Sequence, residues 1–147
     1  MKLIGIKKKN IFVFYIIGLI LGLFIIFAGY MSSIKENNNP LLIILGFIVT
    51  IICIIFLIDV IKSPNNVIEI NLVDKYILLN NRKSKIYLKN IENIRYKQAR
   101  NKYKSLKWGN IYIEANDQIY KCKYVDECES ICYFLHEEIV KAKNEFQ

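Results

Sequence analysis

The sequence lacks the residue patterns that mark most enzyme active sites. It has no G-x-S-x-G nucleophile motif, no phosphate-binding P-loop and no H-E-x-x-H metal-binding helix. The single histidine, His136, follows Cys132 by four residues, and a Cys–His pair could act as a nucleophile. However, Cys132 falls on the apolar stripe of an expected helix, where it would be a core residue. We therefore expect no enzymatic activity.

Cysteine pairs with metal-site spacing are also missing. The four cysteines are Cys53, Cys122, Cys128 and Cys132, and none forms a C-x-x-C pair. Cys128 and Cys132 would share one helical face, but a metal site would need further ligands. We expect no metal and no cofactor. The three cysteines in the second half of the chain are expected to stay reduced in a cytoplasmic domain.

Charge is absent from two long stretches near the N-terminus. Ile11–Tyr30 is twenty residues without a charged side chain, and Leu41–Ile58 is a second run of eighteen. A helix rises about 1.5 Å per residue, so such a run spans about 30 Å, the thickness of a bilayer hydrocarbon core. These runs predict transmembrane spans near 11–30 and 41–61, within a helical hairpin over residues 11–62. The first run is longer than a signal-peptide core and no A-x-A site follows it, so we expect a retained anchor.

The flanking charges predict the orientation of this hairpin. Residues 1–10 carry four lysines, whereas the connecting loop, residues 31–40, carries one lysine and one glutamate. Lys62 and further basic residues follow the second span. Because cytoplasmic flanks of membrane helices are enriched in Lys and Arg, residues 1–10 are expected to form a basic cytoplasmic N-terminus. The prediction is a multi-pass protein of the cell membrane with both termini in the cytoplasm.

Few features within the spans indicate more than anchoring. Gly18 and Gly22 form a G-x-x-x-G step that allows close helix approach, and we favour packing against the second span. Assembly of a homo-oligomer through the spans stays open. Asp59 is the only charged residue in the apolar segments, and it lies at the cytoplasmic end, one turn from Lys62. Thr50 is the only clear polar residue at mid-membrane, so a transport site is not expected.

Residues 63–147 have the pattern of a separate domain. Apolar residues alternate with polar ones, which is typical of half-buried strands. Six or seven strands are expected, with segments at residues 67–72, 76–80, 85–88, 94–98, 110–115 and 118–124. Residues 99–107 are polar and strongly basic, and we expect them to form a loop.

The last segment changes to a helical period. The residues of one apolar stripe recur every three or four positions: Cys128, Ile131, Cys132, Leu135, Ile139 and Ala142. Asp126 is expected to be the N-cap, and Glu129 would complete a capping box. The predicted fold class is α+β with a membrane part, in which a two-helix transmembrane hairpin is followed by strands and a closing C-terminal helix.

Basic residues dominate the polar surface. The net charge is +8, from 21 Lys and Arg against 13 Asp and Glu. Nine basic residues in two clusters are candidates for binding an anionic surface or partner: Arg82, Lys83, Lys85, Arg95, Lys97, Arg100, Lys102, Lys104 and Lys107. The second cluster has no acidic residue, and Tyr96, Tyr103 and Trp108 interleave with it. A solvated loop is the simplest interpretation. Anionic lipid headgroups or a membrane-associated protein are the nearest partners, and nucleic acid is not expected.

The second half of the chain resembles a known family. The resemblance is carried by the run KIYLKNIENI at residues 85–94, by GNIYI at residues 109–113 and by the closing helix. Residues 67–140 thereby resemble the bacterial pleckstrin-homology-like (PH-like) domain that follows paired membrane helices in small membrane proteins. The resemblance implies an antiparallel β sandwich or barrel capped by a C-terminal helix, and no enzyme. Eukaryotic members that bind phosphoinositides place basic residues around the first hairpin loop. Here that loop is expected at residues 73–75, which are only weakly basic, so phosphoinositide binding is not expected.

These observations favour a non-enzymatic, membrane-anchored binding or scaffold protein. Its cytoplasmic domain would contact a protein partner or the anionic membrane surface. The alternative is self-protection against a membrane-active bacteriocin, because some bacteriocin immunity proteins resemble this layout of a few spans and one such domain.

Overall fold

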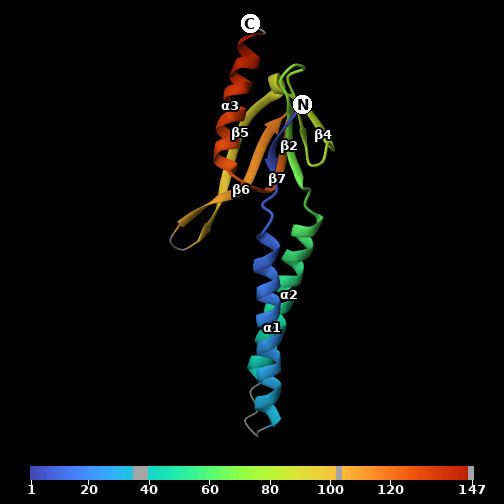
Figure 1. Cartoon of the computed structure of the whole chain (residues 1–147), viewed down its shortest axis with the longest axis vertical. Coiled ribbons are helices and arrows are strands. Elements are labelled where there is room, and N and C mark those ends of the chain that lie inside the picture. The colour runs from blue at the N-terminus through green and yellow to red at the C-terminus, as the bar shows by residue number, and fades with distance from the viewer. Residues whose placement is uncertain (35–39, 102–103, 146–147) are drawn as a thin grey trace. The chain divides into compact units, whose positions relative to one another are not determined.

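The computed structural model describes residues 1–34, 40–101 and 104–145. They form two compact units (Figure 1). One unit is Lys9–Lys62, and the other combines Met1–Lys8 with Ser63–Gln147. The second unit is therefore built from two stretches of chain that lie on either side of the first unit in the sequence.

The first unit is a hairpin of two helices, α1 (Ile11–Ile34) and α2 (Pro40–Lys62). Both predicted apolar helices are present, and each is long and apolar enough to cross a membrane. Most of their large apolar side chains are exposed. A helix that is apolar on all sides suits a lipid environment, because contact between its apolar side chains and water is unfavourable. The predicted connecting loop includes residues 35–39, which lie outside the described residues.

Small residues bring α1 and α2 together. A Cβ atom at Gly22 would lie 2.4 Å from Thr50 Oγ1, and one at Gly18 would lie 2.7 Å from Cys53 Sγ. From the other helix, a Cβ atom at Gly46 would lie 2.6 Å from Ile26 Cγ1. The glycines of the predicted G-x-x-x-G step therefore lie against α2 within one hairpin, where they permit the close approach seen between membrane helices.

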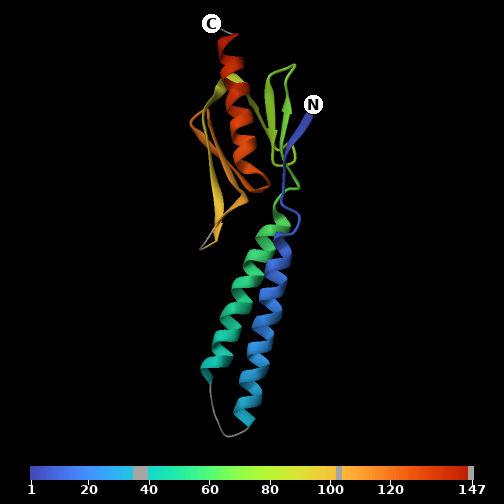
Figure 2. The same ribbon diagram turned by 60° about the vertical axis from the view of Figure 1, so that its left-hand side comes forward.

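The second unit contains two antiparallel sheets (Figure 2). The first has the order β1 (Lys2–Ile6), β2 (Asn66–Asn71), β3 (Tyr76–Leu79) and β4 (Ser84–Tyr87). The second has the order β5 (Ile91–Asn101), β6 (Lys104–Ala115) and β7 (Gln118–Val125). A short 3₁₀ helix, η1 (Leu88–Asn90), joins the two sheets, and α3 (Cys128–Asn144) follows β7. The α+β class is confirmed, with two separate sheets rather than one closed barrel.

β1 is the main departure from the sequence-based prediction, which treated residues 1–10 as a basic tail. Lys2 pairs with Ile70 and Leu3 with Glu69, so residues 2–6 form a strand of the first sheet. A Cβ atom at Gly5 would lie 2.9 Å from the Cβ atom of Ile68, so only glycine allows this approach. The chain thus leaves the domain after β1, forms the helical hairpin and returns at β2.

The core lies between the sheets and α3. It is formed mainly by alternating isoleucines and leucines of the strands, such as Ile68, Ile70, Ile111 and Ile113. α3 packs against β5, β6 and η1. Its predicted stripe is buried at five positions, namely Cys128, Cys132, Leu135, Ile139 and Ala142. Burial of this stripe, rather than helix propensity, stabilises α3 in its position.

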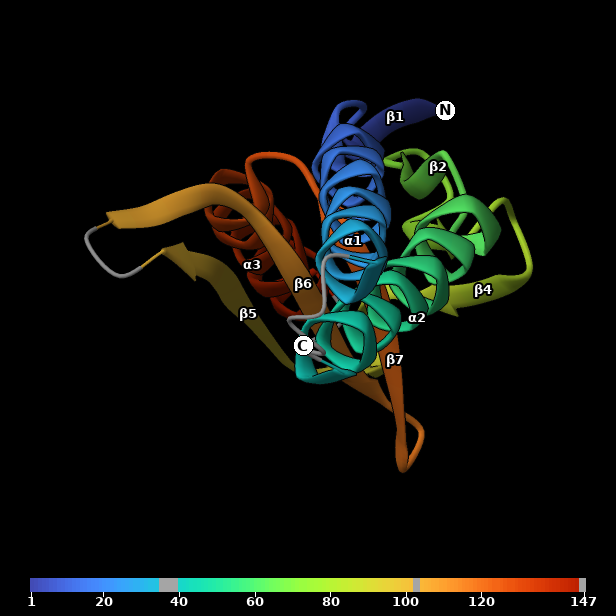
Figure 3. The same cartoon turned by 90° about the horizontal axis from the view of Figure 1, so that it is seen from below.

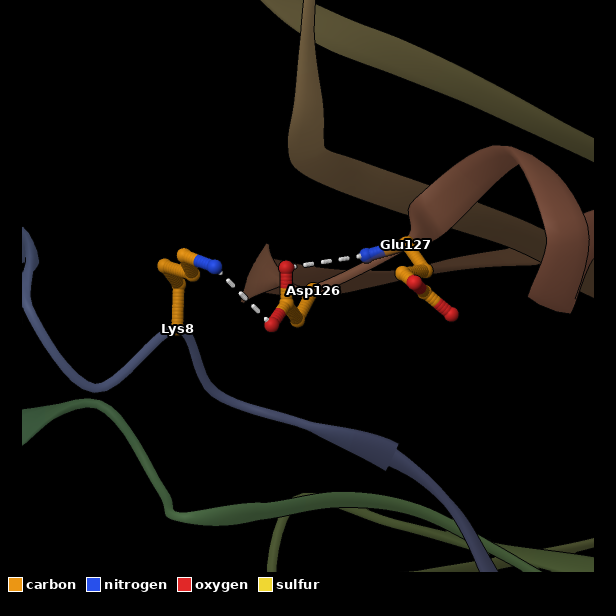
Figure 4. Close-up of polar contacts among 3 residues, drawn as sticks. All are labelled: Lys8, Asp126 and Glu127. Atoms are coloured by element: carbon orange, nitrogen blue, oxygen red, sulfur yellow. Dashed lines mark hydrogen bonds and ion pairs between the residues drawn. The ribbon is translucent and has the colours of Figure 1, made fainter.

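The predicted cap of α3 is wrong. The residue before the helix is Glu127, in the left-handed conformation with φ 47°, and no side chain caps the helix. Asp126 Oδ2 instead lies 3.1 Å from Lys8 Nζ (Figure 4). Glu129 accepts hydrogen bonds from Tyr96 Oη at 2.8 Å and Gln98 Nε2 at 2.9 Å. Both carboxylates bind distant residues, which local spacing could not reveal.

The predicted loop at residues 99–107 is also wrong where the structure describes it. β5 continues to Asn101 and β6 begins at Lys104, with Arg100 paired to Ser105. β7 pairs with β6 only as far as Gly109. Residues 98–101 and 104–108 therefore form a two-stranded ribbon that extends beyond β7, which is called the ribbon below (Figure 3).

Candidate anion-binding surface

The structure divides eight of the nine predicted basic residues between the two sheets. Three belong to the first sheet or its β3–β4 turn: Arg82, Lys83 and Lys85. Five belong to strands of the second sheet: Arg95, Lys97, Arg100, Lys104 and Lys107. Lys102 lies outside the described residues. The two clusters are thus separate surfaces.

The first cluster is engaged in the structure of its own sheet. Arg82 Nε donates to Glu69 Oε2 at 2.9 Å, and Glu69 is only 6% exposed. Lys85 Nζ lies 4.1 Å from the ring centroid of Tyr76 and 5.0 Å from that of Tyr87. Both distances are within the range of cation–π attraction. Arg82 and Lys85 therefore neutralise a buried carboxylate and cover aromatic rings, which gives them a structural role.

The second cluster continues across all three strands of its sheet. Arg95 of β5 is opposite Tyr112 of β6, and Tyr112 is opposite Lys121 of β7. The Arg95 guanidinium carbon and Lys121 Nζ each lie 5.7 Å from the Tyr112 ring centroid. Arg95 Nη2 also lies 2.9 Å from Glu114 Oε1. One aromatic ring with two cations beside it therefore forms the centre of a basic surface.

This surface has members that the sequence analysis missed. Lys121 and Lys123 flank Cys122, which is fully buried. Successive residues of a strand point to opposite faces, so the two lysines lie on the face away from the core. The alternation of Lys121, Cys122 and Lys123 in the sequence could have predicted these two positions. We define the basic face by Arg95, Lys97, Lys121 and Lys123.

A pocket lies at the base of the ribbon, where β7 ends. Its volume is about 710 Å³, and its lining is Tyr96, Lys97, Gln98, Ala99, Arg100, Trp108, Gly109, Asn110 and Tyr124. The lining contains two cations and no carboxylate. The rings of Trp108 and Tyr124 have centroids 6.2 Å apart. The pocket thus combines positive charge with an aromatic wall.

Local backbone geometry shapes this pocket. A Cβ atom at Gly109 would lie 2.2 Å from the carbonyl oxygen of Lys97, so glycine permits the close strand contact at a register shift. Tyr124 has a left-handed φ of 58°, and its backbone N–H donates to Asn110 Oδ1 at 3.2 Å. Together these features fix the position of the Tyr124 ring beside Trp108.

The N-terminal segment runs directly beside the pocket. The Lys8 backbone N–H donates to the carbonyl oxygen of Tyr124 at 2.8 Å, and that of Asp126 donates to Ile6 at 2.9 Å. Lys7 Nζ donates to the carbonyl oxygen of Ser63 at 2.8 Å. Hydrogen bonds thus join the segment before α1 to the segment after α2 and to the end of β7.

Burial and hydrogen bonding shift the pKa of several groups in this domain. Burial raises the pKa of the Cys122 thiol to about 12 and that of Cys132 to about 11, so both stay protonated at neutral pH. The hydrogen bond to Glu129 raises the pKa of Tyr96 well above its ordinary value. Within residues 1–34, 40–101 and 104–145, no group of three His, Cys, Asp or Glu residues could hold a metal ion.

No protein-family model, no curated protein and no solved structure matches this chain.

Proposed function

We propose that the chain is a non-enzymatic, membrane-anchored binding module whose sheet domain contacts the anionic surface of the cell membrane through the basic face. The observation that carries this proposal is the row Arg95–Tyr112–Lys121 across three adjacent strands. This row places two cations, Arg95 and Lys121, on one face of the sheet. Each Lys or Arg close to an anionic membrane contributes about 1 kcal/mol to the free energy of membrane binding. The domain is already tethered, so four such residues are enough to favour its contact with the surface.

The connection of the chain supports this proposal. α1 begins three residues after Lys8, and Ser63 directly follows the end of α2. β1 and β2 belong to one sheet, so both ends of a membrane-spanning hairpin emerge on the side where the domain lies. The lysines of residues 1–9 support a cytoplasmic location for that side, by the positive-inside rule. The domain then stays close to the leaflet that carries the anionic lipids.

The proposal includes a PH-like fold for the domain. The order of four strands, three strands and a closing helix supports it. In this arrangement the helical hairpin takes the place of the connection between the first two strands. Residues 73–75 then join the second and third strands, so they are not the first loop of the domain. The weakly basic character of residues 73–75 therefore carries no argument about the first loop.

Lysine labelling of the full chain in lipid nanodiscs tests the membrane contact. An amine-reactive reagent would be applied in neutral phosphatidylcholine discs and in discs that also contain phosphatidylglycerol, with mass spectrometry of each lysine. Lys97 and Lys121 should be protected in the anionic discs, and salt should reverse the protection by screening. Lys83 and Lys143, outside the basic face, serve as internal controls. Equal labelling of Lys97 and Lys121 in both kinds of disc would contradict the proposal.

A further inference from the structure

We infer that the pocket at the base of the ribbon holds the phosphate-bearing headgroup of an anionic membrane lipid. This inference rests on the proposed function and deepens it, because it names one ligand site within a surface that otherwise acts through its overall charge. The site is formed by Lys97 and Arg100 as cations, by Asn110 as a neutral donor and by Trp108 and Tyr124 as an apolar wall.

The polar lining suits a phosphate group. Arg can donate two parallel hydrogen bonds to phosphate, and Lys adds a compact charge. The Asn110 side-chain oxygen accepts from the Tyr124 backbone N–H, which directs the NH₂ group of Asn110 to act as a donor elsewhere. Glu129 bonds to Tyr96 and Gln98, two lining residues, but it is not part of the lining. Two cations against this one carboxylate leave the site positive.

The aromatic wall favours a lipid over a free anion. Trp108 and Tyr124 each combine an apolar ring with a polar edge, and such rings favour the membrane–water interface. Inorganic phosphate and soluble glycerol phosphate offer this wall no apolar group to contact, whereas the acyl esters and first acyl methylenes of a phospholipid do. The pairing of charged and aromatic residues in one pocket therefore matches the two parts of a lipid headgroup region.

The position of the pocket along the chain gives an independent argument. Tyr124, a lining residue, accepts a hydrogen bond from Lys8. Lys8 precedes Ile11, the first residue of α1, by three positions. A fully extended chain covers at most about 3.6 Å per residue, so Lys8 lies within about 11 Å of the start of α1. A pocket beside Lys8 is therefore held within reach of the headgroup layer.

The single tryptophan of the chain makes the site directly observable, because Trp108 is the only source of tryptophan emission. The full chain would be placed in phosphatidylcholine nanodiscs with and without phosphatidylglycerol. Anionic discs should shift the Trp108 emission to shorter wavelength and lower its quenching by acrylamide several-fold. Inorganic phosphate and soluble glycerol phosphate added to neutral discs form the arm for a free anion. Neither should reproduce the effect.

Charge-matched variants separate the pocket from the overall charge. The double change Lys97→Gln and Arg100→Gln should abolish the response of Trp108. The control, Lys83→Gln with Lys143→Gln, removes the same charge from exposed positions elsewhere and should keep the response. An unchanged Trp108 in anionic wild-type discs would overturn the inference, as would equal effects of the two double variants. An equal response to soluble phosphate would overturn the assignment to lipid.

The lysine-labelling result distinguishes this failure from failure of the proposed function. If Lys121 is protected in anionic discs while Trp108 does not respond, the membrane contact stands and the pocket site is wrong. If neither residue responds, both proposals fail. Lys121 does not line the pocket, so the two measurements report on different parts of the surface.

Discussion

Lys8 and Asp126 form an ion pair of 3.1 Å across 118 positions of the sequence. Both side chains are partly exposed, so the pair itself contributes about 1 kcal/mol or less. Its importance is positional, because it joins the N-terminal segment to the turn before α3 (Figure 4). Together with the backbone bonds of Lys7 and Lys8, it makes the first eight residues an integral part of the sheet domain.

The first prediction concerns the boundaries of the domain. A fragment of residues 63–147 lacks β1, which leaves Ile68 and Ile70 of β2 without their neighbouring strand. We expect it to melt at least several degrees below a fragment in which residues 1–8 are joined to residue 63 by a short Gly/Ser linker. Circular dichroism during heating measures the difference. Identical melting curves would show that β1 adds nothing to the fold.

The second prediction concerns the buried carboxylate of Glu69. Arg82→Ala removes its charged partner and should lower the free energy of unfolding by about 1–3 kcal/mol, measured by denaturant titration. Arg82→Ala combined with Glu69→Gln should lose less than the sum of the two single changes, because no unpaired charge remains. Lys83→Ala, at the next position, is the control and should change little. A loss for Arg82→Ala no larger than this control would refute the role of the pair.

The third prediction concerns packing within the helical hairpin. A Cβ atom at Gly18 would lie 4.0 Å from the Cβ atom of Cys53, within the range of about 3.5–4.5 Å that separates the two Cβ atoms of a disulfide. Gly18→Cys should therefore form a disulfide with Cys53 on mild oxidation, detected by mass spectrometry of the linked peptides. Gly29→Cys is the matched control, because that position faces Ile43 instead. Equal crosslinking of the two variants to Cys53 would contradict the helix register.

The fourth prediction concerns alkaline pH. Burial raises the pKa of Cys122 to about 12 and that of Cys132 to about 11, from an ordinary value of 9.0. The folded state then holds these protons more tightly than the unfolded state. Their contribution to stability is complete below pH 9 and is lost as pH rises towards 11 and beyond. Denaturant titrations across this range should show a steeper loss for the wild type than for Cys122→Ala with Cys132→Ala. Parallel curves would count against burial of the two thiols.

The same shift predicts slow alkylation of the folded protein. At pH 8 an ordinary thiol is about one-tenth thiolate, whereas a thiol with the pKa of Cys132 is about one-thousandth. Iodoacetamide should therefore modify Cys122 and Cys132 far more slowly in the folded protein than after denaturation. Mass spectrometry after timed alkylation checks this.

Elements with a distinct sequence pattern could be predicted. The two apolar helices follow from long runs without charge, the strands from β2 to β7 from apolar–polar alternation, and α3 from its apolar stripe. β1 could not be found in this way. Its sequence, KLIGI, is only five residues long and does not alternate, and its partner β2 begins sixty positions after β1 ends. Only the sheet as a whole makes residues 2–6 a strand.

The candidate site was only partly predictable for the same reason. Arg95, Lys97 and Arg100 were found because they are close in sequence. Lys121 and Lys123 were missed because they join that cluster only through pairing of β6 with β7. The cap at Asp126 was predicted wrongly because its real partner, Lys8, belongs to the segment beside β1. Each miss traces to a contact between distant parts of the chain.

The place of β1 in the chain also sets an order of events during synthesis. β1 leaves the ribosome before either apolar helix, and its partner β2 leaves only after both. The first sheet can therefore close only once the hairpin has been made, and the domain remains incomplete until then. Before the hairpin inserts into the bilayer, β1 and the rest of the domain would remain apart. Folding of the domain would therefore follow insertion of the helices that anchor it.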